Sequence, residues 1–154
     1  MTRPLRYLSR VNPLSYPNVG TDLDRTTRLL KHHYLKAFRR AGVDLSTEQW
    51  VLLDHLYQEG PASQTDLANG TYKDAPTVSR IIDKLVKKGL VNRERFPNDR
   101  RRHNVVITDS GRDLHDNLQP HVQSLREQTW RGLSEEDHAR LQYVLEQIRN
   151  NFGG

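Results

Sequence analysis

The stretch KDAPTVSRIIDKLVKKGLVNRERFPNDRRRHNVVIT, residues 73–108, contains the change of pattern on which the fold depends. Its first half places apolar residues at helical spacing: Val78, Ile81, Ile82, Leu85 and Val86. Asp74 is a candidate N-cap, Pro76 fits the first turn, and Gly89 ends the pattern. In the second half, two short β-prone runs flank a Pro-Asn-Asp turn and three consecutive arginines. The stretch therefore predicts a helix followed by a β-hairpin with a basic tip.

Two shorter helices are predicted just before this stretch. Ser46 and Gln49 form a capping-box pattern, and Gly60-Pro61 ends the helix that it opens. The apolar residues of that helix fall on one face: Trp50, Leu53, Leu56 and Tyr57. Ser63 and Asp66 give another cap signal, which opens a second short helix over residues 63–70. In this helix the small Ala68 allows a close approach to its neighbour. Two short helices joined by a tight turn predict a helix-turn-helix, and the hairpin after it predicts a winged version.

The rest of the chain has helical spacing on both sides of this unit. We expect a helix over residues 21–41, and two more over 109–130 and 134–150, with Pro120 as a bend or weak point in the first of these. The predicted fold is mainly α with a small β-hairpin wing (α+β), a winged helix-turn-helix with an all-helical dimerisation region. The expected division is an N-terminal arm (1–20), a dimerisation helix (21–45), the DNA-binding region (46–108), C-terminal dimerisation helices (109–150) and a tail (151–154).

The flanking helices carry more apolar surface than a helix-turn-helix core can cover. We therefore expect a homodimer, with two DNA half-sites about one helical turn apart, roughly 34–36 Å between centres. The arm contains Pro4, Pro13 and Pro17. It could pack on the partner subunit, contact DNA or remain without order, and the sequence leaves these alternatives open.

The positive charge is concentrated in one part of the chain. The net charge is +5, and residues 73–103 hold ten Lys/Arg against four Asp/Glu, whereas residues 104–154 hold five against eight. A basic block of this kind predicts a polyanionic partner, here double-stranded DNA. The absence of cysteine excludes disulfides and thiol redox sensing. No apolar run is long enough for a membrane span, and no signal peptide pattern is present, so we expect a cytoplasmic protein.

The polar face of the helix that begins near Ala75 predicts the DNA contacts. Arg80 is the candidate for pairing with guanine, and Thr77 could touch a base edge or a thymine methyl group. The candidates for phosphate contacts are Ser79, Lys84, Lys87 and Lys88. At the hairpin, the candidates for the minor groove or its phosphates are Arg100, Arg101, Arg102 and His103, with Asp99 shaping the turn. The remaining candidates lie at helix starts and on the first strand: Ser63, Gln64, Thr65, Asp74, Pro76 and Arg93.

With these features in order, the chain resembles the MarR family of transcriptional regulators. The resemblance rests on LSTEQWVLLDHL (45–56), SQTDLAN (63–69), PTVSRIIDKLVKKGLVNR (76–93), NDRRRHNVVITDSG (98–111) and LSEEDHARL (133–141), and covers roughly residues 21–150. It implies an obligate homodimer with interleaved terminal helices, a winged helix on each side, and a pseudo-palindromic operator. It also implies that a small aromatic or anionic ligand binds between the two regions and weakens DNA binding. The chain departs from peroxide-sensing relatives because it has no cysteine, and its arm is longer than the usual pattern.

Other functions are weighed against this one. Tyr34, Phe38 and Trp50 are either plain core or the lining of a ligand pocket, since they fall where the two regions meet. The histidines His32, His33, His55, His115 and His121 could suggest a metal site, but adjacent histidines on a helix point apart. We expect no metal, no cofactor and no enzyme, because no phosphate-binding loop, metal motif or nucleophile elbow is present. The prediction is a regulator, more specifically a repressor; the alternatives are a sequence-neutral DNA architectural protein and a protein-interaction module.

Overall fold

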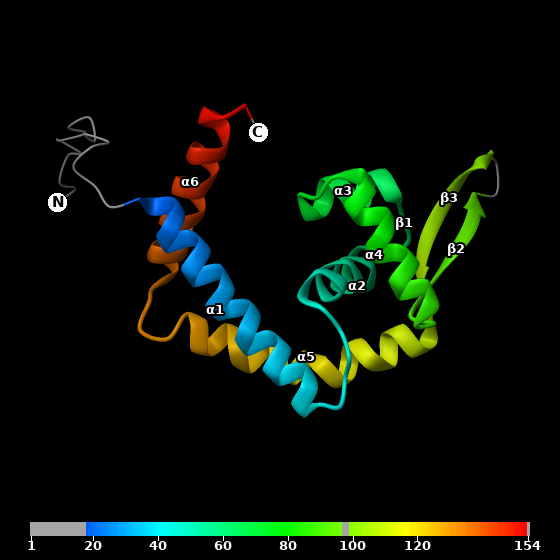
Figure 1. Ribbon diagram of the computed structural model, residues 1–154, viewed down its shortest axis with the longest axis horizontal. Coiled ribbons are helices and arrows are strands. Elements are labelled where there is room, and N and C mark those ends of the chain that lie inside the picture. The colour runs from blue at the N-terminus through cyan, green and yellow to red at the C-terminus, as the bar shows by residue number, and fades with distance from the viewer. Residues whose placement is uncertain (1–17, 97–98, 154) are drawn as a thin grey trace.

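The computed structural model describes residues 18–96 and 99–153, and the side chains of residues 96 and 99–102 fall outside this description. The elements follow in the order α1 (Val19–Arg40), α2 (Thr47–Glu59), β1 (Ala62–Ser63), α3 (Gln64–Thr71), α4 (Ala75–Lys87), β2 (Val91–Phe96), β3 (Asp99–Ile107), α5 (Asp109–Thr129) and α6 (Glu135–Asn151). In Figure 1, α2, α3, α4 and the hairpin form one group, α1 and α6 project to the other side, and α5 runs beneath both. The predicted winged helix-turn-helix is confirmed.

The group of α2, α3 and α4 forms a three-helix core. Ser46 and Ser63 both make complete capping boxes, and Asp74 caps α4, as the sequence predicts. The centre of the core consists of fully or almost fully buried aliphatic side chains: Leu52, Leu53, Leu56, Leu67, Val78, Ile82 and Leu85. Gly70 of α3 lies so close to α2 that an added Cβ would come within 2.6 Å of the His55 ring. The short α3 therefore packs closely against α2.

The wing is a three-stranded sheet rather than a bare hairpin. β3 lies in the centre and pairs antiparallel with β2 on one side and with β1 on the other. The two-residue β1 was not predicted, because two residues carry no periodic signal. It pairs Ala62 with Val105 and Ser63 with Asn104, and so joins the start of α3 to the base of the wing.

The C-terminal end of α1 packs on the same core, whereas its N-terminal half and α6 do not. Phe38 is completely buried, but no residue of α6 is. Several large apolar side chains on these helices and the loop before α6 are left exposed: Val19, Leu23, Leu29, Leu133, Leu141, Tyr143, Val144 and Phe152. The stripe expected along α6 is therefore present in the sequence but meets no core within the described part of the chain.

The first helix begins two residues earlier than predicted. The arm was expected to reach residue 20, but the Asn18 side chain accepts a hydrogen bond from the Gly20 N–H, and α1 begins at Val19. The rest of the arm, residues 1–17, lies outside the described residues.

Pro120, predicted as a bend or weak point, lies inside α5, which continues on both sides of it. Within residues 18–96 and 99–153, none of the helices has the length and apolar character to cross a bilayer.

Candidate nucleic-acid interface

Asp74 organises the first turn of α4. One of its carboxylate oxygens accepts the Thr77 backbone N–H at 2.8 Å, and the other accepts the Thr77 hydroxyl, also at 2.8 Å. These hydrogen bonds, the backbone one first, lower the pKa of Asp74 below its ordinary value. Thr77 Oγ1 in turn accepts a hydrogen bond from Arg80 Nη2 at 3.4 Å. Asp74 thus positions the two side chains that the sequence assigns to base contacts.

The two faces of α4 have opposite chemistry. Val78, Ile81, Ile82 and Leu85 are buried against the core, whereas the opposite face is exposed and polar. The exposed side chains of that face are Pro76, Arg80, Asp83, Lys84 and Lys87, and Ser79 is half-buried beside them. An exposed helix of this kind presents side chains that can enter a DNA major groove.

Two of the predicted DNA contacts are already engaged within the protein. Lys88 Nζ donates to the Asp44 carbonyl and lies 3.1 Å from Asp44 Oδ2, which ties the end of α4 to the loop before α2. Arg93 Nη2 lies 2.7 Å from Asp83 Oδ1, which ties β2 to α4. These pairings give Lys88 and Arg93 a positioning role that the sequence did not indicate.

A hollow of about 270 Å³ lies where α3 meets the wing. It is lined by Ser63, Gln64, Thr65, Arg93, His103 and Val105. Thr65, Arg93 and His103 are exposed there, whereas Ser63 is buried and occupied as a helix cap. Gln64 Nε2 donates to the Ala75 carbonyl at 3.3 Å and so supports the start of α4. The pairing of β1 with β3 therefore brings together candidates that are about 40 residues apart in sequence.

The basic tip of the wing is only partly described. The backbone of Arg100, Arg101 and Arg102 belongs to β3, but their side chains, with Asp99, lie outside the described residues. The predictions for the minor groove therefore remain predictions.

A second candidate site is a pocket of about 270 Å³ between α1, α2 and α5. Its lining includes the predicted Tyr34 and Trp50, together with Lys31, Asp54 and Arg126. The third predicted aromatic, Phe38, is fully buried and packs against Trp50 with ring centroids 5.8 Å apart, so it is a core residue. Lys31 Nζ lies 2.6 Å from Glu48 Oε1, and this hydrogen bond lowers the pKa of Glu48 to about 2.

Asp54 joins this pocket to a buried histidine that sequence reasoning missed. Its carboxylate lies 2.8 Å from His115 Nε2 and 3.6 Å from Arg126 Nη2. The His115 ring is stacked between Tyr57 and Trp50, at centroid distances of 3.7 and 4.8 Å. The sequence offered His115 only as one of several scattered histidines, and no local pattern marks a side chain that is buried between two helices.

A model of the MarR family matches residues 45–103, from the start of α2 into the wing. The chain belongs to the MarR family. Its membership makes it a DNA-binding transcriptional regulator, and MarR proteins act by binding DNA rather than by catalysis.

Several solved structures share this fold over most of the chain. Bordetella bronchiseptica BpsR, whose DNA binding is regulated by 6-hydroxynicotinic acid, is 26% identical with a TM-score of 0.75, over 86% of this chain and 93% of that one. The S. aureus MepR–DNA complex has 24% identity and a TM-score of 0.77, over 88% and 99%. Rhodococcus jostii CouR bound to p-coumaroyl-CoA has 23% identity and a TM-score of 0.73, over 85% and 91%.

Proposed function

We propose that this MarR-family regulator is a repressor that binds a pseudo-palindromic operator as a homodimer in the cytoplasm and is released by a small ligand. The observation that carries the DNA-binding part is the start of α4, where Asp74 holds Thr77 and Thr77 holds Arg80 on the exposed face. A guanidinium held in this way can pair with the two acceptors of guanine in the major groove.

The remaining contacts divide by chemistry. Lys84 and Lys87 extend from the same face of α4 and would neutralise phosphates, which fixes register without reading sequence. Thr65 and His103 flank the hollow at the base of the wing and would contact the backbone there. Arg100, Arg101 and Arg102 are proposed for the adjacent minor groove, on the strength of their charge and position in β3.

The exposed apolar side chains support the homodimer. α6 buries none of its residues, and its apolar side chains Leu141 and Val144 are 45% and 44% exposed. Leu29 of α1 is 57% exposed. Exposed apolar side chains gathered on helices that pack on no core are typical of subunit interfaces. We propose that α1, α5 and α6 form the dimerisation region and that residues 46–108 bind DNA.

The α1–α2–α5 pocket supports the proposal that a small ligand binds the protein. It places Tyr34 and Trp50 beside the cations of Lys31 and Arg126, which suits an aromatic ring carrying an anionic group. 6-Hydroxynicotinic acid, which regulates DNA binding by BpsR, and p-coumaroyl-CoA, which is bound to CouR, have this character. A ligand carboxylate that pairs with Arg126 would break its ion pair with Asp54, and this ion pair connects α5 to α2.

The test is a selection from random DNA duplexes at near-physiological salt, followed by sequencing. Enrichment of a two-fold palindrome with half-sites about one turn apart supports the dimeric regulator. Retention of DNA without enrichment would instead indicate a sequence-neutral architectural protein, and no retention would indicate a protein-interaction module. The selected operator then serves in a displacement assay with 6-hydroxynicotinic acid and related aromatic acids, in which an unchanged affinity for all of them would contradict release by this ligand class.

A further inference from the structure

A groove of about 340 Å³ runs between α1 and α5. It lies on a different face of α1 from the α1–α2–α5 pocket, and the two share no lining residue. Six polar side chains line this α1–α5 groove: His33, Lys36, Arg40, His121, Ser124 and Gln128. No carboxylate of residues 18–95 or 103–153 lines it. The groove is therefore a concave surface built from hydrogen-bond donors and positive charge.

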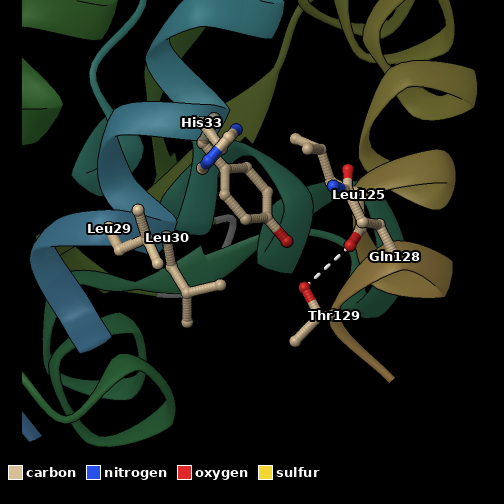
Figure 2. A pocket seen from close by; sticks show the side chains of 7 residues that line it. Leu29, Leu30, His33, Leu125, Gln128 and Thr129 are labelled. Atoms are coloured by element: carbon tan, nitrogen blue, oxygen red, sulfur yellow. Dashed lines mark hydrogen bonds between the residues drawn. The ribbon is translucent and has the colours of Figure 1, made fainter. Parts of the chain in front are cut away.

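The two walls of the groove, α1 and α5, carry their polar residues at the same spacing. α1 contributes residues 33, 36 and 40, and α5 contributes residues 121, 124 and 128, so each helix presents one i, i+3, i+7 stripe. Figure 2, which shows the adjoining apolar pocket, places His33 on α1 and Gln128 on α5 on opposite sides of the gap between the helices. Side chains from both walls can thus reach one ligand.

Within the described part of the chain, the two cations of the groove, Lys36 and Arg40, differ from their neighbours in having no counter-ion. Lys31 and Arg126, near by on the same two helices, lie next to Glu48 and Asp54. Among the described residues, Lys36 and Arg40 make no ion pair or side-chain hydrogen bond. Like charges gathered in a concavity repel each other, and an anion that enters it removes this repulsion.

We propose that the α1–α5 groove binds a small phosphorylated metabolite. A phosphoryl group has three terminal oxygens and up to two negative charges, so it can accept from Arg40, Lys36 and Ser124 at once, whereas a carboxylate has two oxygens and one charge. Neutral or charged imidazoles of His33 and His121 can donate to the same group. The volume lies at the small end of the range for metabolite sites and exceeds what a single phosphate ion needs.

Isothermal titration with inorganic pyrophosphate, at constant ionic strength and without DNA, tests this site. We expect saturable binding of one pyrophosphate per chain. The double variant K36Q/R40Q removes two charge-assisted donors and should weaken the affinity by about tenfold or more. The matched variant R112Q/R131Q removes the same charge from two exposed positions outside the groove and outside the proposed DNA contacts, and should leave the affinity within about twofold of the unaltered chain.

Three results would overturn the proposal. The first is the absence of saturable binding to the folded dimer at millimolar pyrophosphate. The second is equal loss of binding in R112Q/R131Q, or none in K36Q/R40Q, which would move the anion to another surface. The third is a change of oligomeric state in K36Q/R40Q, measured by light scattering, which would make the groove a contact between subunits. The test does not involve the operator or its ligand, but the groove lies on α1 and α5, which the proposed function assigns to the dimerisation region, so the oligomeric state is measured alongside binding.

Discussion

Arg93 of β2 and Asp83 of α4 form an ion pair of 2.7 Å that connects the wing to the helix proposed to enter the major groove. Both side chains are partly exposed, at 36% and 52%. The pair therefore positions the wing relative to α4 more than it stabilises the fold. Exposed ion pairs are screened by water and contribute little to the free energy of unfolding.

For this pair, a double-mutant cycle with Asp83→Asn and Arg93→Gln should give a coupling free energy of about 0.2–1 kcal/mol in urea unfolding. The operator affinity should fall more in Arg93→Gln than in Asp83→Asn, because the first change also removes a positive charge beside the DNA. A coupling energy well above this range would mean that the pair is a stability element instead.

Arg80→Ala should weaken binding to the selected operator by about 1–3 kcal/mol and relax the base preference at one position of each half-site. Lys87→Ala should weaken all duplexes alike and reduce the slope of log affinity against log salt by about one. Fluorescence anisotropy with operator and scrambled duplexes measures both. An unchanged base preference in Arg80→Ala would remove that residue from the proposed base contacts.

The cap of α4 predicts a pH dependence of stability. Because hydrogen bonds from Thr77 lower the pKa of Asp74 in the folded state, its stabilisation is present above the unfolded value, about 3.9, and is lost as the pH falls below it. Asp74→Ala should therefore melt at a lower temperature than the unaltered chain at pH 7, with the difference shrinking towards pH 3. Asp74→Asn keeps a capping oxygen and should retain a pH-independent part of the effect. A constant difference between Asp74→Ala and the unaltered chain at all pH values would contradict this role.

The buried pair of Asp54 and His115 predicts a larger effect on stability. Asp54→Ala leaves His115 Nε2 buried without its partner, which should lower the free energy of unfolding by about 1–3 kcal/mol. His32→Ala, an exposed change on α1, should stay within about 0.5 kcal/mol of the unaltered chain. Urea denaturation followed by tryptophan fluorescence measures both, and similar losses in the two variants would argue against the pair.

The proposed dimer depends on the apolar face of α6. Leu141→Glu with Val144→Glu should produce monomers, because burying two carboxylates in an apolar interface is strongly unfavourable. Size-exclusion chromatography with light scattering measures the mass, and circular dichroism checks that the helices remain. A folded dimer in this double variant would place the subunit contact elsewhere.

Much of the DNA-binding unit could be predicted from the sequence because its signals are local. The capping boxes at Ser46 and Ser63, the cap at Asp74 and the stripe of α4 each depend on residues three or four apart, and the structure confirms all of them. The order of these elements predicted the winged fold, and the motifs predicted the family. The positions of Arg80, Lys84 and Lys87 on an exposed face follow from the same helical spacing.

The remaining features depend on contacts between distant segments. A strand of two residues, such as β1, leaves no periodic pattern in the sequence. β1 forms because its backbone pairs with β3. The engagement of Lys88 by Asp44 and of Arg93 by Asp83, and the stacking of His115 between Tyr57 and Trp50, join residues from 10 to 65 positions apart. The two matching stripes of the α1–α5 groove are likewise visible in the sequence only as scattered basic residues. Local spacing determines which face of each helix is polar, but only packing decides which polar faces meet, because that depends on the shape of the assembled core.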